Sequence, residues 1–301
     1  MKKFLSVLMA GAMLFGVLTL AGCGDTTTDT GEDTTTTEDT TTTAEFTTVT
    51  EGVLTMSTNA AFPPYEMTDD SGAVVGIDAE IAAAIAEKLG LELQIDDMDF
   101  DGALAAPQSG KSDIVMAGVT VNEERQLVLD FTETYANGVQ KVIVAEGSDI
   151  TMENLGEQQI GTQKGTTGNI LTTDEFGEDH VIAYDDAIAA VQALNNGQID
   201  CVVIDSAVAD NLVEANPGLT TLDTDYANEE YAIGVAKGNT ALLDAINTAL
   251  QELIDDGTVQ SIIDKYIPTD GTAADEAGTT DEAGATDEAG ATDGAEADTA
   301  A

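Results

Sequence analysis

Short apolar stretches alternate with segments of helical periodicity through the central part of the chain. The first four of these stretches predict strands, which we expect at residues 53–58, 91–95, 113–118 and 138–146. Between the first two, Ile81, Ile85 and Leu89 fall on one face of a helix. Asp78 could cap this helix, and Gly90 would end it. Strands that alternate with helices in this way are typical of an α/β protein.

A second series of strands and helices follows, after a strand long enough to pass from one lobe to another. Its strands are expected at residues 159–163, 181–184 and 201–204, each followed by a helix. The chain then returns through residues 231–238 to a last helix, which Gly257 ends. Two such series predict two open α/β lobes with a crevice between them. Ligands in such sheets bind beyond the carboxyl ends of strands, where Thr120, Thr166 and Asp205 fall.

Both ends of the chain differ from this central part. Residues 1–22 carry lysines and then an apolar run, which predicts a signal peptide. A retained transmembrane helix is the alternative, but the run is short and interrupted by glycines. Residues 23–51 are rich in Thr and Asp and predict a disordered linker. Residues 268–301 repeat a short acidic motif without large apolar side chains, which predicts a disordered tail.

The charge of the chain excludes one class of partner. Among 301 residues, 57 are Asp or Glu and 9 are Lys or Arg, so the formal net charge is −48. Binding to nucleic acids or anionic lipid headgroups depends on Lys and Arg that neutralise phosphates. We therefore expect no nucleic-acid partner, and a monomer whose acidic surface keeps it soluble.

The sequence offers little for catalysis or metal binding. His180 is the only histidine, and no Ser or Cys nucleophile has a recognisable partner beside it. The acidic residues show neither the spacing of a calcium loop nor a His/Cys cluster. Cys201 lies in an apolar strand and is expected to be buried and unreactive. We expect no cofactor, no metal and no enzymatic activity.

Arg125 is the only arginine in this acidic chain, and it follows Glu123 and Glu124. A guanidinium is a planar fork that binds a carboxylate through two hydrogen bonds, so Arg125 is a candidate anion site. A solvated charge at a helix end is the alternative. The glycine-rich turn at 164–169 lacks the ending of a phosphate loop, but it leads into a helix N-terminus that could bind a carboxylate.

Several segments resemble, in order, the family 3 bacterial solute-binding proteins, which serve ABC importers of polar amino acids. They include "NAAFPPYE" (59–66), "DFDGALAAPQSGKSDIVMAGVTVNEER" (99–125), "IGTQKGTTG" (160–168) and "IDCVVIDSAVA" (199–209). The resemblance covers about residues 52–267. It implies a type II periplasmic-binding-protein fold, in which two strand crossovers join two lobes. Lobe 1 would comprise residues 52–140 and 230–267, and lobe 2 residues 141–229.

The resemblance also implies roles for individual residues. Arg125 matches the position that binds the ligand α-carboxylate, and Gly118 and Thr120 match positions that add a backbone donor and a hydroxyl. Thr167, with Thr166 beside it, matches a donor from the opposite lobe. These residues would hold one end of a zwitterionic amino acid.

Other matched positions would hold the rest of the ligand. Asp205 matches the acceptor of the α-ammonium, with a plain helix N-cap as the alternative. Phe62 and Phe100 match aromatic positions beside the ligand side chain, with core packing as the alternative. Asn59 stands where relatives carry an acid that receives a basic side chain, so a strongly cationic ligand is less expected. Glu66 lies close by and could compensate.

The tetrapeptide "LAGC" at residues 20–23 resembles the lipobox of bacterial lipoproteins, in which the cysteine carries the lipid. Cys23 would then anchor the protein, through palmitate and related lipid chains, on the extracytoplasmic face of the cell membrane. The expected function is capture of a polar amino acid between closing lobes and its delivery to a cognate ABC permease. A dehydratase-type enzyme on the same scaffold, with Glu66 as its acid or base, and a sensory domain are the alternatives.

Overall fold

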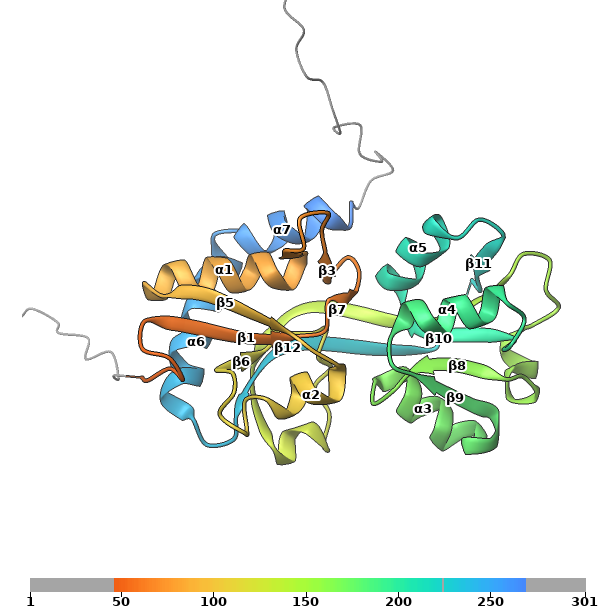
Figure 1. Cartoon of the computed structure of the whole chain (residues 1–301), viewed down its shortest axis with the longest axis horizontal. Coiled ribbons are helices and arrows are strands. Elements are labelled where there is room, and N and C mark those ends of the chain that lie inside the picture. The colour runs from red at the N-terminus through yellow and green to blue at the C-terminus, as the bar shows by residue number, and fades with distance from the viewer. Residues whose placement is uncertain (1–45, 224, 269–301) are drawn as a thin grey trace, which may run out of the picture. The chain divides into compact units, whose positions relative to one another are not determined.

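The computed structural model describes residues 46–223 and 225–268, which belong to one compact unit (Figure 1). Cys23, the expected signal peptide, most of the expected linker and nearly all of the expected acidic tail lie outside the described residues. Within the part that is described, every helix is too short or too polar to span a bilayer.

The strands form two sheets. The large, nine-stranded sheet has the order β5-β1-β6-β12-β7-β10-β8-β9, and β11 also pairs with β7. Its strands are β1 (Val53–Thr58), β5 (Glu92–Asp97), β6 (Ile114–Val115), β7 (Leu129–Ala145), β8 (Ile160–Gln163), β9 (Val181–Tyr184), β10 (Cys201–Asp205), β11 (Leu219–Thr221) and β12 (Ala227–Ala236). The small sheet contains β2 (Ala61–Phe62), β3 (Glu66–Thr68) and β4 (Val74–Val75).

Helices cover these sheets in two lobes, which Figure 1 shows side by side. Lobe 1 contains α1 (Ile77–Leu89), α2 (Phe100–Ala105), α6 (Thr240–Asp255) and α7 (Thr258–Tyr266). Lobe 2 contains α3 (Thr167–Phe176), α4 (Ala187–Asn195) and α5 (Ser206–Ala215). The alternation of strands and helices in the sequence therefore predicts the α/β class and the two lobes correctly.

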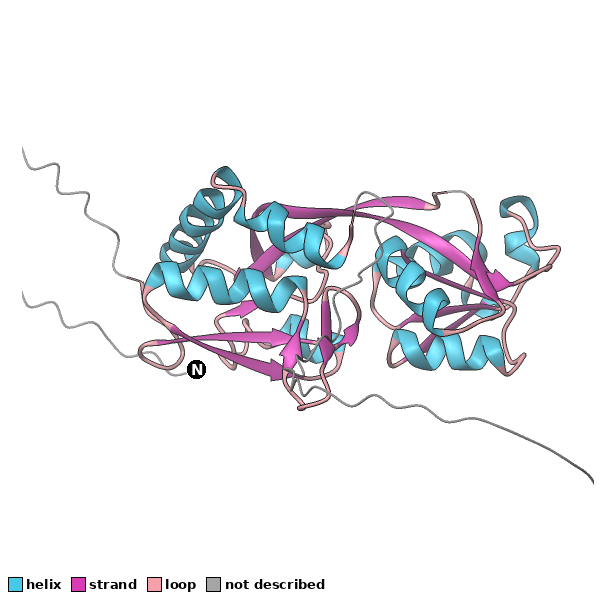
Figure 2. Ribbon diagram, turned by 90° about the horizontal axis from the view of Figure 1, so that it is seen from above, coloured by secondary structure: helices cyan, strands magenta, loops and turns pink. Residues whose placement is uncertain are grey.

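Two long strands join the lobes (Figure 2). Strand β7 is 17 residues long, and it pairs with β12 over residues 129–140 and with β10 over residues 140–144. It is longer than the predicted strand at 138–146 because residues 129–137 are polar as well as apolar and lack a clear strand pattern. Strand β12 runs antiparallel beside it. Residues of these two crossing strands form one wall of the site described below.

Each lobe buries an apolar stripe of its helices. In lobe 1, Ile81 and Ile85 of α1 and Ile246 and Leu250 of α6 have no exposed surface. Full burial of such a side chain contributes about 1.5–3 kcal/mol. Cys201 begins β10 and has no exposed surface. Burial raises the pKa of its thiol to about 12, so the thiol is protonated and unreactive at neutral pH.

Two local predictions about helices meet different outcomes. Gly90 ends α1 in the left-handed conformation, as the sequence predicts, and α2 ends just before Pro107, whose ring does not fit a helix interior. Asp78 does not cap α1: Gly76 is the N-cap, and Asp78 lies buried in the first turn. Its carboxylate turns inward because it accepts hydrogen bonds from buried groups elsewhere in lobe 1. Helix α7, after the stop at Gly257, was not predicted as a separate element.

Candidate ligand-binding site

A pocket lies between the lobes, above the crossing strands. Of the expected ligand-binding residues, all except Asp205 line it: Asn59, Phe62, Phe100, Gly118, Thr120, Arg125, Thr166 and Thr167. The remaining lining residues are Glu66, Ala117, Gln140, Gln163, Ile204, Glu229 and Tyr231. Among these remaining residues, the sequence singles out Glu66 alone. Residues from both lobes and from both crossing strands therefore form one site.

Arg125 begins a short 3-10 helix and turns into this pocket, with 7% of its surface exposed. Its Nη1 donates to the Thr120 carbonyl oxygen (2.7 Å), and its Nη2 donates across the lobes to the Gly165 carbonyl oxygen (3.2 Å). The guanidinium lies 5.3 Å from the centre of the Phe100 ring. Burial lowers the pKa of Arg125, and no carboxylate oxygen of the described residues lies within 4.0 Å of the guanidinium. A solvated charge at a helix end, the alternative role, does not fit this burial.

The threonines of the two lobes meet beside Arg125. Thr167 Oγ1 donates to Thr120 Oγ1 across the lobes (2.9 Å), and Thr120 Oγ1 donates to Glu229 Oε1 (2.7 Å). Thr166 is the N-cap of α3, since its hydroxyl accepts from the Asn169 N–H (3.4 Å). The first backbone N–H groups of α3 thus start at the pocket wall, where they favour an anion.

Gly118 lies at the pocket wall in the left-handed conformation, with φ of 54°. A Cβ atom at this position would press against the ring of Phe62, so glycine lets the backbone approach the aromatic wall. The Gly118 N–H donates to Asp78 Oδ2 (3.0 Å), and Tyr135 donates to Asp78 Oδ1 (2.8 Å). In this arrangement the backbone donor expected to bind a ligand carboxylate is engaged within the protein.

Asp205 lies behind the pocket wall and has no exposed surface. Its Oδ1 accepts from the N–H groups of Ala207 (2.8 Å) and Val208 (3.1 Å), so it caps α5, and its Oδ2 accepts from the Tyr231 hydroxyl (2.9 Å). A Cβ at Gly138 would collide with Asp205 Oδ2, so this glycine makes room for the carboxylate. The described geometry therefore gives Asp205 the N-cap role that the sequence left as the alternative.

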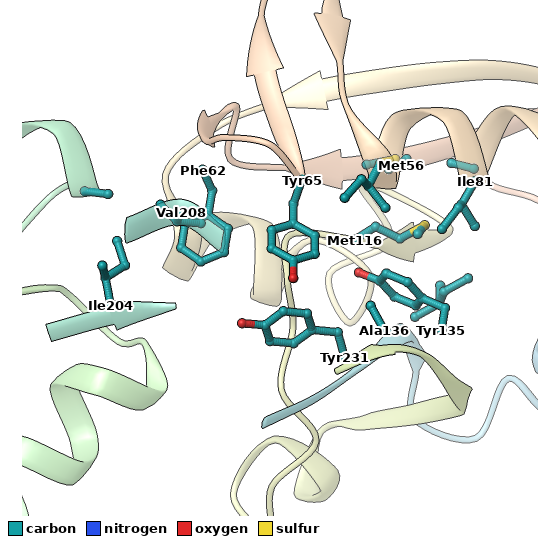
Figure 3. Packing of buried hydrophobic residues seen from close by; sticks show 14 of the residues in the cluster. Met56, Phe62, Tyr65, Ile81, Met116, Tyr135, Ala136, Ile204, Val208 and Tyr231 are labelled. Atoms are coloured by element: carbon teal, nitrogen blue, oxygen red, sulfur yellow. The ribbon is translucent and has the colours of Figure 1, made fainter. Parts of the chain in front are cut away.

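Asn59 and the two phenylalanines are buried or half-buried within the wall. Asn59 donates to the Met98 carbonyl oxygen (2.8 Å) and accepts from Gln163 Nε2 of lobe 2 (2.8 Å), so the protein itself occupies both ends of its amide. Phe62 and Phe100 are 8% and 6% exposed, and both line the pocket while packing in the core. Figure 3 shows Phe62, Tyr65 and Tyr231 near one another, with Ile204 of lobe 2 at the left of the view.

Glu66 is the unusual member of the site. It begins β3, has no exposed surface, and finds no N–H or hydroxyl donor for its carboxylate oxygens among the described residues; the neighbouring carboxyl of Asp78 can bond to it only by sharing a proton. Burial and then the nearby Asp78 carboxylate raise the pKa of Glu66 well above its usual range. An acid directly after the apolar-aromatic segment at 62–65 is the signal in the sequence that points to this position. A buried carboxylate without partners is unfavourable unless a donor reaches it.

Glu229 is a second buried carboxylate, and the sequence does not single it out. It lies on β12, 4% exposed, in the segment "ANEEY" whose other acid, Glu230, is exposed. Gln140, from β7, donates to its Oε2. Alternating burial along a strand could have identified it, since Glu229 falls on the same face as the apolar Tyr231. Within residues 46–223 and 225–268, no cluster of three or more metal-binding side chains occurs.

The buried carboxylates also make stability depend on pH. Burial raises the pKa of Asp78 to about 6, and burial and then Glu229 raise the pKa of Asp205 to about 6. Each group binds its proton more tightly in the folded state. The free-energy cost of burying the ionised carboxyl therefore lowers stability fully above about pH 6, and it is relieved as the pH falls toward 4. Protonation at pH 5 would recover roughly 1–1.5 kcal/mol for each carboxyl.

We therefore expect the ligand-free protein to unfold at a higher temperature at pH 5 than at pH 7. The Asp78→Asn variant should show a smaller rise, because one titrating group is gone. Glu87→Gln, an exposed change on the same helix, is the matched control and should keep the full rise. Calorimetry over this pH range measures the difference; an unchanged rise in Asp78→Asn would contradict the prediction.

Comparison with known proteins places the chain in a family. Residues 54–269 match the bacterial extracellular solute-binding proteins, family 3. The chain belongs to this family. The match covers the strands and helices of both lobes, and its members serve outside the cytoplasm, as the family description states.

Individual proteins are similar to this chain over most of their own length. A probable histidine-binding protein of Neisseria gonorrhoeae is 29% identical over 282 residues, which cover 91% of this chain and 98% of that protein. An ancestral arginine-binding protein bound to glutamine is 39% identical, with a TM-score of 0.69, over 72% of this chain and 99% of that one. A mutant of ArgBP from T. maritima is 37% identical, with a TM-score of 0.68, over 71% and 95% of the two chains.

These relatives establish the fold and the general function. The chain has the two-lobed type II periplasmic-binding-protein fold. As a family 3 solute-binding protein, it is an amino-acid-binding component of an ABC importer. The relatives named above carry the names of binding proteins.

Proposed function

We propose that this family 3 protein captures an amino acid with a positively charged side chain, with arginine as the first candidate. Glu66 carries this proposal. The ends of the ligand backbone already have candidate partners in Arg125 and Asp205, whereas Glu66 lines the pocket as a buried carboxylate that no N–H or hydroxyl of the described residues reaches. A guanidinium or ammonium group would supply the donors that this carboxylate lacks.

The relatives support a cationic ligand as well. Several relatives are named arginine-binding proteins, whereas others are named for cystine or glutamine, so the names agree with a cationic ligand but do not select it. The weaker expectation of a cationic ligand rested on Asn59, which stands in place of an acid. The Asn59 amide is already hydrogen-bonded to Met98 and Gln163. It therefore gives no information about the charge of the ligand side chain.

The α-carboxylate would bind where positive potential is concentrated. Arg125 is buried there beside the N-terminus of α3, and the hydroxyls of Thr120 and Thr167 lie next to it. A bound carboxylate would replace the contact of Nη2 with the Gly165 carbonyl by a charge-assisted hydrogen bond. The Gly118 N–H donates to Asp78 and the Thr166 hydroxyl donates to the Gln163 carbonyl oxygen (2.7 Å), so either would add a donor to the ligand only by exchanging that partner.

The α-ammonium would bind on the acidic side of the pocket. Tyr231 has one hydroxyl proton but two carboxylate neighbours, Asp205 Oδ2 (2.9 Å) and Glu229 Oε2 (3.0 Å). One proton cannot serve both oxygens fully, so one carboxylate can accept from a further donor. We assign the ammonium to Asp205, because its Oδ2 shares only the Tyr231 proton while Glu229 Oε2 also accepts from Gln140, and because the cap bonds of α5 use the other oxygen, Oδ1. Phe62 and Phe100 would then form the walls of the channel for the ligand side chain.

Lipid anchoring through Cys23 belongs to the same proposal. The residues around it lie outside the described part of the chain, and the lipobox-like tetrapeptide "LAGC" supports it. The anchor and a Thr/Asp-rich linker would hold a monomeric receptor on the outer face of the cell membrane, next to its permease. We propose no enzymatic reaction, since of the two acids that line the pocket Glu66 is assigned to ligand binding and Glu229 is bonded to Thr120, Gln140 and Tyr231.

Calorimetric titration tests the ligand class. The chain from residue 24 onward is titrated with each of the twenty standard amino acids. We expect L-arginine to bind most tightly, with a Kd below about 10 μM, and L-glutamine to bind at least about tenfold more weakly, because it cannot pair with a charged Glu66. Tighter binding of neutral or acidic amino acids than of L-arginine and L-lysine would contradict the cationic proposal while leaving the family function intact.

A further inference from the structure

Glu229 lies where the two crossing strands meet, and none of the ligand contacts proposed above uses it. It belongs to β12, and its register partner on β7 is Gly138, so it sits where the two crossing strands run side by side. The side chain is 4% exposed. A carboxylate buried at the crossing of two strands must be compensated by nearby donors.

Three donors compensate it, and they come from different parts of the fold. Thr120 of lobe 1 donates to Oε1 (2.7 Å), and Gln140 of β7 donates to Oε2. The Tyr231 hydroxyl, shared with Asp205 of lobe 2, also lies at Oε2 (3.0 Å). One carboxylate is therefore bonded to lobe 1 directly and to lobe 2 through a single tyrosine.

The bond with Thr120 also fixes a direction. Thr120 has one hydroxyl proton, and it points to Glu229 Oε1, so the lone pairs of Thr120 Oγ1 face away from Glu229. They accept the hydroxyl proton of Thr167 from lobe 2 (2.9 Å). The backbone carbonyl of Thr120 at the same time accepts from Arg125 (2.7 Å). Glu229 thus orients the residue that contacts both the opposite lobe and the guanidinium.

We propose that Glu229 is a positioning residue that couples the crossing strands to the contact between the lobes. Its bonds to Thr120 and, through Tyr231, to Asp205 are satisfied together in the closed arrangement of the lobes, and opening separates at least the Thr120–Thr167 pair. Glu229 consequently stabilises the closed form and slows escape of the bound amino acid. It sets residence time, and the direct ligand contacts belong to the residues assigned above.

The test compares rates of ligand binding and release. Dyes attached through Glu87→Cys on α1 and Glu214→Cys on α5, both exposed, report closing of the lobes by energy transfer in a stopped-flow instrument. L-arginine is the probe, and the chain from residue 24 onward is used. We expect Glu229→Gln to raise koff by about tenfold or more, with kon within about threefold of the starting protein, because closure follows encounter.

A double-mutant cycle separates positioning from general destabilisation. Thr167→Val removes the donor from lobe 2, so in this background Glu229→Gln should raise koff by less than about threefold further. Glu230→Gln, on the next residue of β12 and exposed, is the matched control and should leave both rates unchanged. Wild-type koff in Glu229→Gln, or a double variant whose effect equals the product of the single effects, overturns the proposal.

Two further arrangements keep the outcome decisive. If Glu229→Gln does not fold, as thermal unfolding would show, Thr120→Val removes the same link, and a wild-type koff in that variant also overturns the proposal. If the starting protein does not bind L-arginine, the ligand proposed above fails. The same rate comparison is then made with whichever of the twenty amino acids binds most tightly, since the role of Glu229 does not depend on the ligand side chain.

Discussion

Replacing Arg125 with alanine is expected to lower affinity for L-arginine, the proposed ligand, by roughly 30-fold to several thousand-fold, or about 2–5 kcal/mol. The ligand carboxylate would lose its cationic partner in a pocket where Glu66, Glu229 and the nearby Asp205 supply negative charge. Calorimetric titration of the variant measures this loss. Because any amino acid carries the carboxylate, the loss should be similar for neutral amino acids.

Two companion variants define what the guanidinium provides. Arg125→Lys keeps the charge but cannot place donors at both the Thr120 and Gly165 carbonyls, so we expect an intermediate loss. Gln126→Ala, an exposed change on the next residue of the same 3-10 helix, is the matched control and should bind normally. Affinity of Arg125→Ala within threefold of wild type would remove Arg125 from the site, whatever the ligand.

Replacing Glu66 with glutamine should separate ligand charge from ligand shape. We expect affinity for L-arginine to fall by about 100-fold or more, near 3 kcal/mol, because a charge-assisted bond is replaced by a neutral one in a buried site. Affinity for L-glutamine should fall by much less or rise. The preference for the cationic ligand, measured by titration with both amino acids, is therefore expected to collapse.

The same variant should make the ligand-free protein more stable. Glu66 is completely buried and finds no N–H or hydroxyl donor among the described residues, and burial raises its pKa well above the usual range, so at neutral pH the wild-type protein retains the free-energy penalty of protonating it or of burying its charge. An amide of the same shape is neutral without taking up a proton and is easier to bury. A higher unfolding temperature together with weaker binding of L-arginine is the expected pair of results. Glu92→Gln, on the exposed side of β5, serves as the control. Lower stability with unchanged ligand preference would contradict the role of Glu66.

The elements predicted most accurately are those whose local pattern is not ambiguous. The strands at 53–58 and 181–184 are confirmed at their predicted bounds as β1 and β9, since each is a short run with polar or glycine residues at its ends. Strand β7 was predicted too short because its first half is stabilised by pairing with β12, far away in the sequence. Pairing partners of this kind leave little trace in a local pattern.

Carboxylates were the hardest residues to interpret. Asp78 looks like a helix cap from its position before an apolar stripe, but its partners Gly118 and Tyr135 are brought to it only by the fold. Glu66 and Glu229 are buried, although acidic residues in such an acidic chain are normally exposed. Arg125 stands out in the sequence because it is the only arginine, whereas each acidic role has 57 acidic residues as candidates.

Because Glu66 and Asp78 are neighbouring buried carboxylates, binding of a cationic ligand would exchange a proton on Glu66 for the positive charge of the ligand. Burial and then Asp78 favour the neutral form of Glu66 before the ligand arrives, because they raise its pKa. A guanidinium that binds to Glu66 favours the charged form and expels the proton into the medium. Affinity for a cationic amino acid would then increase with pH, and affinity for a neutral one would not. The receptor would accordingly load more readily in a neutral or alkaline surrounding than in an acidic one.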